Sequence, residues 1–68
     1  MTTQTLLAIR LANREIARAV RQGLLAEDRP ERKRYAAQAR TAQRLREGLR
    51  GGTVDARSAR ATLLALPL

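Results

Sequence analysis

Apolar residues recur every three or four positions along most of this chain, which is the period of an α-helix and not of a β-strand. Two breaks interrupt the pattern, one at Glu27-Asp28-Arg29-Pro30 and one at Gly51-Gly52. The sequence therefore predicts an all-α fold with helices at about residues 5–26, 29–50 and 54–66. Because the first break is short, we expect the first two helices to form an antiparallel hairpin within a single small domain, residues 1–68.

The first predicted helix is amphipathic, and its apolar arc covers about half of the helix surface. The arc consists of Leu6, Ile9, Ala12, Asn13, Ile16, Ala17, Ala19, Val20, Gly23 and Leu24. One edge of the arc carries small residues, namely Ala8, Ala12, Ala19 and Gly23. A second helix can approach closely along such an edge. At the start of the helix, Thr3 or Thr5 is expected to be the N-cap.

The second predicted helix has a much narrower apolar side. Its seam repeats at spacings of three and four residues, as in a coiled coil, and consists of Tyr35, Gln38, Ala42, Leu45 and Leu49. Asp28 is expected to accept a hydrogen bond from the amide of Glu31 at the helix start, with Pro30 in the first turn. Gly51 or Gly52 is expected to end the helix in the left-handed conformation.

The third predicted helix is short, with Thr53 as its expected N-cap and Pro67 at its end. One face of this helix is expected to carry Val54, Ala61, Leu64 and Leu68. The narrow seam of the second helix cannot cover the broad arc of the first helix. The missing cover comes either from the third helix, folded back through Val54, Leu63, Leu64 and Leu66, or from a second copy of the hairpin.

We favour association, through either a second copy or a larger partner, because so short a chain buries too little surface to be stable without help. Of the two sources of cover for the first helix, we favour a dimer of hairpins over the folded-back third helix. In a dimer of hairpins, Asn13 can pair with its symmetry mate and fix the register of the helices, although an Asn at the edge of the arc that binds water is an equal alternative. The predicted helix-association interface comprises Leu6, Ile9, Ala12, Asn13, Ile16, Val20, Leu24, Tyr35, Ala42, Leu45 and Leu49.

Composition favours binding over catalysis. The chain carries 14 Lys and Arg residues against 6 Asp and Glu, with a formal net charge of +8 and no His or Cys. His and Cys are the side chains that most often serve acid–base and nucleophilic catalysis, so we predict a protein that is not an enzyme and holds no cofactor or metal. The first long apolar stretch is interrupted by Arg10, Arg14, Arg18 and Arg21. We therefore expect a cytoplasmic protein with no membrane span.

Two groups of cations are the candidate binding residues. The first is a stripe on the first helix, Arg10, Arg14, Arg18 and Arg21. The second lies on the second helix and consists of Arg29, Arg32, Lys33, Arg34, Arg40 and Arg44. Cations at a helix N-terminus oppose the helix dipole, so local stability does not explain the cluster at residues 29–34. The ordinary alternative for both groups is a solvated helix face, with an Arg44–Glu47 pair on the second.

The cations are expected to contact the phosphates of duplex DNA or structured RNA. Tyr35 is the one aromatic residue, and because it lies on the packed seam, stacking on single-stranded bases is not indicated. The alternative is a small regulator, inhibitor or assembly component, of the kind that phages use, which docks on a larger acidic protein. Arginine binds carboxylates as well as phosphates, so the sequence leaves both partners open.

Overall fold

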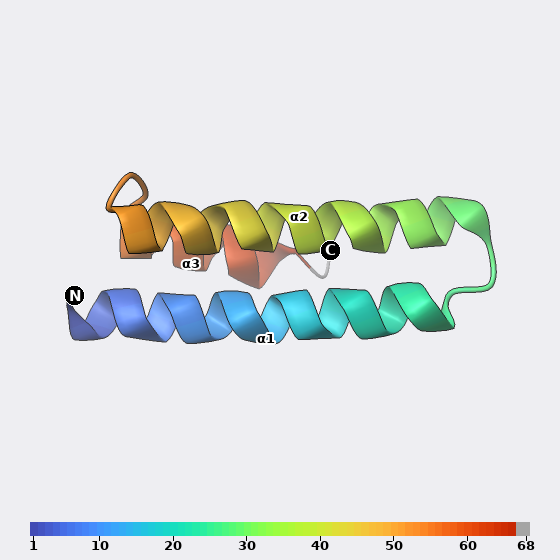
Figure 1. Cartoon of the computed structure of the whole chain (residues 1–68), viewed down its shortest axis with the longest axis horizontal. Coiled ribbons are helices and arrows are strands. Elements are labelled where there is room, and N and C mark those ends of the chain that lie inside the picture. Colours follow the sequence, from blue (N-terminus) through green and yellow to red (C-terminus); the bar gives the residue numbers. More distant parts are fainter. Residues whose placement is uncertain (67–68) are drawn as a thin grey trace.

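Three helices make up the described part of the chain, residues 1–66 of a computed structural model. Helices α1 (Thr3–Leu25) and α2 (Arg29–Gly51) lie antiparallel as a long hairpin, and α3 (Ala56–Ala65) packs against one half of it (Figure 1). These residues contain no strand, which confirms the predicted all-α fold. Pro67 and Leu68, on which two expectations for the third helix rested, lie outside the described residues.

The molecule is a short rod with extents of 40 × 18 × 15 Å. The hairpin sets the long axis, because α1 and α2 each have 23 residues whereas α3 has 10. Within residues 1–66, none of the helices combines the length and the apolar character that crossing a membrane requires.

Side-chain caps and one glycine set the ends of α1 and α2. Thr2 Oγ1 accepts a hydrogen bond from the Thr5 amide at 3.1 Å, so the cap of α1 precedes both threonines that the sequence suggested. Asp28 Oδ1 accepts a hydrogen bond from the Glu31 amide at 2.8 Å, as predicted. Gly52 ends α2 with a φ of 77°, a left-handed conformation that favours glycine.

The turn before α3 differs from the expectation. The N-cap is Asp55, whose Oδ1 accepts a hydrogen bond from the Ser58 amide at 2.8 Å. Thr53 instead donates its hydroxyl to the Gly48 carbonyl oxygen at 3.4 Å, and this contact ties the turn to the last part of α2. Val54 consequently lies in the turn and not in the helix.

The α1–α2 contact follows the small-residue edge of α1. Ala8, Ala12 and Ala19 are buried there, and Ala42 and Leu49 are the buried residues of α2. Alanine lets two helices approach closely, and the sequence had indicated this edge. The residues at the opposite edge of the arc remain largely open to solvent: Leu6 and Val20 are each 49% exposed, and Leu24 is 82% exposed.

Helix α3 folds back on the hairpin and completes two core clusters. The first consists of Ala8, Ile9, Leu49 and Ala59, and the second of Ala12, Ala42 and Leu63. Leu63 is completely buried, whereas Leu64 is 60% exposed and Ala61 is exposed. The apolar face predicted for this helix was therefore wrong, because it was aligned on Val54, which precedes the helix. Self-association of the hairpin stays a prediction.

Candidate anion-binding surface on α2

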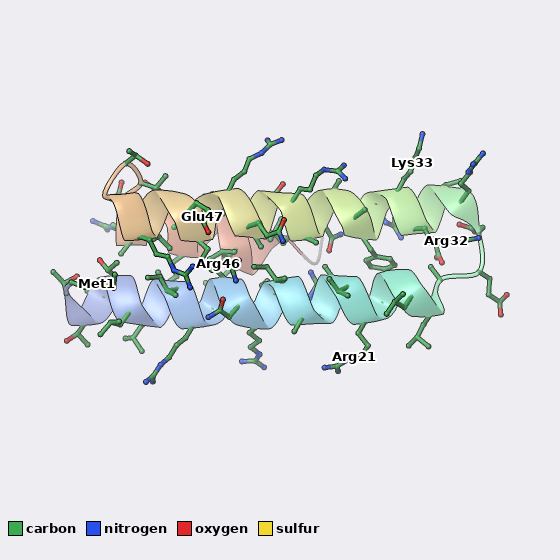
Figure 2. All side chains as sticks on the ribbon, viewed as in Figure 1. Met1, Arg21, Arg32, Lys33, Arg46 and Glu47 are labelled. Carbon is green, nitrogen blue, oxygen red and sulfur yellow. The ribbon has the colours of Figure 1, made fainter. Side chains whose placement is uncertain are left out.

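The outer face of α2 carries a row of four exposed cations, Arg29, Lys33, Arg40 and Arg44, called here the α2 row. Their spacing of four, seven and four residues places them within an arc of about 60° at 3.6 residues per turn. This arc lies opposite the seam that packs on α1. At 1.5 Å per residue, the α2 row spans about 22 Å along the helix axis. Lys33 points away from α1 in Figure 2.

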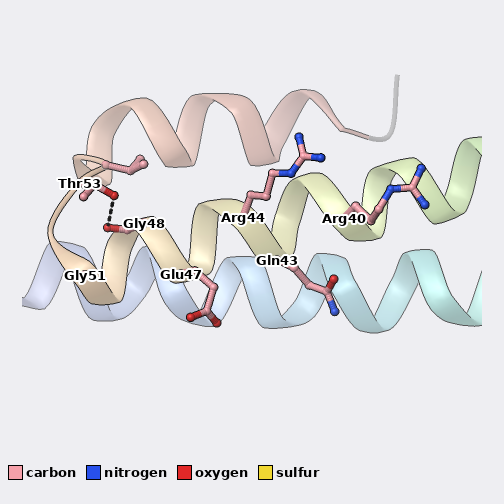
Figure 3. A pocket seen from close by; sticks show the side chains of 8 residues that line it. Arg40, Gln43, Arg44, Glu47, Gly48, Gly51 and Thr53 are labelled. Carbon is pink, nitrogen blue, oxygen red and sulfur yellow. Dashed lines mark hydrogen bonds between the residues drawn. The ribbon is translucent and has the colours of Figure 1, made fainter.

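Small residues separate the cations, and shallow hollows lie beside them. Ala36 and Ala37 occupy the exposed surface between the two halves of the row. A hollow of about 570 Å³ is lined by Arg29, Arg32, Lys33 and Ala36. A second hollow, of about 650 Å³, is lined by Arg40, Gln43, Arg44, Glu47, Gly48, Gly51, Thr53 and Val54 (Figure 3). An elongated partner can therefore lie close to the helix between the long side chains.

The one carboxylate beside the α2 row turns away from it. Glu47 Oε1 lies 3.6 Å from Arg50 Nη1 and 3.8 Å from Arg46 Nε. The expected Arg44–Glu47 pair does not form, and in Figure 3 the two side chains extend to different sides of α2. Within residues 1–66, no member of the α2 row makes a hydrogen bond or an ion pair through its side chain.

Other carboxylates serve the helix ends. Asp28 caps α2, and Asp55 caps α3 through the Ser58 amide at 2.8 Å and the Ser58 hydroxyl at 2.9 Å. These two hydrogen bonds stabilise the charged carboxylate and lower the pKa of Asp55 below its ordinary value of 3.8. Within residues 1–66, neither carboxylate forms an ion pair with a member of the α2 row.

Arg18 lies in an internal network and not on an exposed stripe. Its Nε is 3.2 Å from Glu15 Oε2, and Glu15 is only 7% exposed. Arg18 Nη1 donates to Gln22 Oε1 at 2.7 Å, and Nη2 donates to Gln38 Oε1 at 2.8 Å on α2. The network neutralises a buried carboxylate and links the two helices. The other cations of the predicted stripe are exposed: Arg10, Arg14 and Arg21.

Two cations of the cluster at residues 29–34 contact the protein itself. Arg32 donates from Nη2 to the Glu27 carbonyl oxygen at 3.2 Å and from Nε to the Asp28 carbonyl oxygen at 3.4 Å. These bonds hold the turn between α1 and α2. The guanidinium carbon of Arg34 lies 5.7 Å from the centroid of the Tyr35 ring, within cation–π range. Both side chains therefore have structural contacts that the α2 row does not have.

The predicted association residues are divided between the core and the surface. Those buried inside the chain are Ile9, Ala12, Ala42 and Leu49, and those partly buried are Ile16, Tyr35 and Leu45. Asn13 is exposed, and its Oδ1 accepts a hydrogen bond from Arg46 Nη1 at 2.9 Å. The amide thus joins α1 to α2 within one chain. Asn13 was expected to pair with its symmetry mate or with water, and Arg46 was not among the predicted binding residues. The signal in the sequence was a polar amide on an apolar arc.

Comparisons of the chain with protein families, with curated proteins and with solved structures give no significant match.

Proposed function

We propose that this protein binds the phosphate backbone of duplex DNA or structured RNA through the α2 row, without catalysing a reaction. The observation that carries the proposal is the alignment of Arg29, Lys33, Arg40 and Arg44 on one exposed helix face with no carboxylate to neutralise them. Like charges on one helix face oppose helix formation, so a bound polyanion converts this repulsion into attraction.

The dimensions of the row suit a nucleic-acid strand. One strand of a duplex presents a phosphate about every 3.4 Å along the axis, so a row of about 22 Å passes roughly six phosphates. Lys and Arg are the usual phosphate contacts, and the formal net charge of +8 draws the chain toward any polyanion. Alanines at positions 36 and 37 leave room for the backbone to lie against the helix.

Base reading is a minor part of the proposed interaction. Gln43 is the one amide side chain that lines the hollow around Arg40 and Arg44. Phosphate contacts position a protein on nucleic acid without carrying sequence information. We therefore expect binding with little sequence preference and with a steep dependence on salt.

A matched pair of charge variants tests the proposal. The first variant replaces Arg29, Lys33, Arg40 and Arg44 by Gln, and the control replaces Arg10, Arg14, Arg57 and Arg60 by Gln, with the same change in net charge. Each B-DNA contact contributes about 0.9 to the slope of log K against log salt. The α2 variant is expected to flatten that slope by up to about 3.6, and the control to change it much less.

Two results would contradict the proposal. One is an equal decrease in the salt slope of both variants, because binding would then depend on net charge and not on the α2 row. The other is equally tight binding of the unmodified protein to poly-glutamate at the same ionic strength, which would indicate a carboxylate-bearing partner. Circular dichroism of both variants checks that the helices are retained, as expected for exposed side chains.

A further inference from the structure

An apolar groove runs between α1 and α3, on a different side of the molecule from the α2 row. Two adjoining hollows of about 720 and 530 Å³ share Leu11 and Leu64, and so form one continuous groove. Leu7 joins these two residues in lining it. Leu7 is 52% and Leu64 is 60% exposed, so the floor of the groove presents leucine side chains to solvent. A groove with an apolar floor can seat the apolar face of a partner helix.

Cations line both walls of this groove. Arg14 and Arg21 come from α1, and Arg57 and Arg60 come from α3. All four are exposed, and none forms an ion pair within residues 1–66. In Figure 2, Arg21 extends from the side of α1 that faces away from α2, whereas Lys33 of the α2 row extends in the opposite direction.

The two carboxylates of the groove are already engaged. Asp55 binds the amide and the hydroxyl of Ser58, and Glu15 binds Arg18. The groove thus combines an apolar floor with cationic walls, and its five arginines outnumber its two carboxylates. A ligand that matches it must be apolar along its centre and acidic along both sides.

We propose that this groove binds an amphipathic helix of another protein, with apolar residues at i, i+3 or i+4 and i+7 and with Asp or Glu on both flanks. Helix-in-groove recognition uses this arrangement of anchors. Arginine is enriched at protein interfaces, and its planar guanidinium binds carboxylates through two hydrogen bonds. From Gln4 to Arg21 the α1 wall is about 25 Å long, which matches four to five turns of helix.

The chemistry of the groove disfavours other occupants. Nucleic acid has no apolar ridge for the leucine floor, and the groove has no aromatic residue on which a base can stack. A second copy of this chain carries a formal net charge of +8 and would bring cations against cations. The partner is therefore a different, acidic protein, and this inference does not depend on nucleic-acid binding by the α2 row.

A synthetic peptide of about 18 residues, with Leu along one helical face and Glu on both flanks, tests the proposal against the full chain. Two control peptides have the same length: one scrambles the same residues so that Leu no longer forms a face, and the other replaces Glu by Lys. We expect the amphipathic acidic peptide to bind in fluorescence anisotropy at physiological ionic strength. The scrambled peptide is expected to bind at least about tenfold more weakly, and the Lys peptide not to bind.

Variants of the chain then locate the site. Leu64→Asp is expected to weaken peptide binding by about tenfold or more, whereas Leu24→Asp, at an exposed position outside the groove, leaves it unchanged. Each of Arg57→Gln and Arg60→Gln is expected to weaken binding by up to about fivefold, and Arg40→Gln to have no effect. Circular dichroism verifies that Leu64→Asp remains folded, as its exposure predicts.

Three outcomes would overturn the proposal. Equal binding of the amphipathic and scrambled peptides would reduce the interaction to charge attraction. An equal loss of peptide binding with Leu24→Asp and Leu64→Asp would show that the peptide binds outside the groove. Binding of phosphatidylserine-containing vesicles that Leu64→Asp abolishes, with no binding of the acidic peptide, would assign the groove to an anionic membrane surface.

Discussion

The two halves of the hairpin are buried to different degrees, although the same two helices run through both. In the three-helix half, residues 1–16 and 41–66, α3 encloses the core, and Ala12, Ala42 and Leu63 are completely buried. In the two-helix arm, residues 17–40, Ala19 is the one buried apolar residue, and Leu24 is 82% exposed. The third helix, of 10 residues, contributes Ala59 and Leu63 to the core of the three-helix half.

Polar contacts take the place of a core in the two-helix arm. Arg18 bridges to Gln38, Arg32 holds the turn, and Asp28 caps α2. A hydrogen bond adds about 0.5–1.5 kcal/mol, whereas burial of a leucine adds about 1.5–3 kcal/mol. We therefore expect the two-helix arm to open at a lower free energy than the three-helix half.

The largest expected effect follows from removing the side chain that α3 inserts into the core. Leu63→Ala should lower the free energy of unfolding by about 2–5 kcal/mol, because the site is fully enclosed and a cavity remains. Leu64→Ala, the adjacent and largely exposed leucine, is the matched control and should change it by less than about 0.5 kcal/mol. Urea denaturation followed by circular dichroism measures both. Similar losses for the two variants would mean that α3 does not pack through Leu63.

The next effect concerns the internal network at the base of the two-helix arm. Arg18→Gln should lower the free energy of unfolding by about 1–3 kcal/mol, because buried Glu15 loses its cation. Arg14→Gln, an exposed neighbour on the same helix, should have almost no effect. In a double-mutant cycle, the double variant Glu15→Gln/Arg18→Gln should lose less free energy of unfolding than the two single variants lose in sum. If the two changes are additive, Arg18 and Glu15 do not interact.

Replacing a glycine by alanine should change stability in opposite directions in the two regions. A Cβ on Gly48 would overlap the side chain of Val54 in the turn before α3, so Gly48→Ala should destabilise the three-helix half by about 1–3 kcal/mol. A Cβ on Gly23 would lie 3.4 Å from Tyr35 Cβ, an ordinary contact. Gly23→Ala should therefore stabilise the two-helix arm by about 0.5–1 kcal/mol through helix propensity. Thermal melting of both variants tests the signs, and a stabilising Gly48→Ala would refute the packing of this turn.

The smallest effect is a dependence of stability on pH. The Ser58 hydrogen bonds lower the pKa of Asp55 below 3.8, so folding favours the charged carboxylate. Its contribution to stability is present above about pH 4 and is lost as the pH falls through the folded-state pKa. Asp55→Asn keeps a capping side chain without a titrating group. Its melting temperature should fall less between about pH 5 and pH 2.5 than that of the unmodified protein, and parallel curves would contradict this role.

Much of the fold could be predicted from the sequence because its signals are local. Asp28 and Pro30 mark the start of α2, Gly52 marks its end, and the small-residue edge of α1 indicates where α2 packs. The face of α3 could not be predicted, because it depends on whether Val54 lies inside the helix. That choice is made by the contacts of Thr53 and Asp55 in the turn.

The candidate site could be predicted only in part. Helical spacing places Arg10, Arg14 and Arg18 near one face, but it does not show which of them meets a buried carboxylate. The relevant signal was Glu15, three residues before Arg18. The groove between α1 and α3 was not foreseen, because it exists only where Leu64 of a separate helix comes to lie beside Leu11.

Native-state hydrogen exchange tests most directly the claim that the two regions differ in stability. Amides of the two-helix arm, at residues 20–25 and 33–38, should show protection factors at least about tenfold lower than those at residues 9–15 and 42–49. Leu63→Ala should narrow this gap by lowering protection in the three-helix half. Equal protection along the whole hairpin in the unmodified protein would contradict the account, because it would mean that the two helices open as one unit regardless of α3.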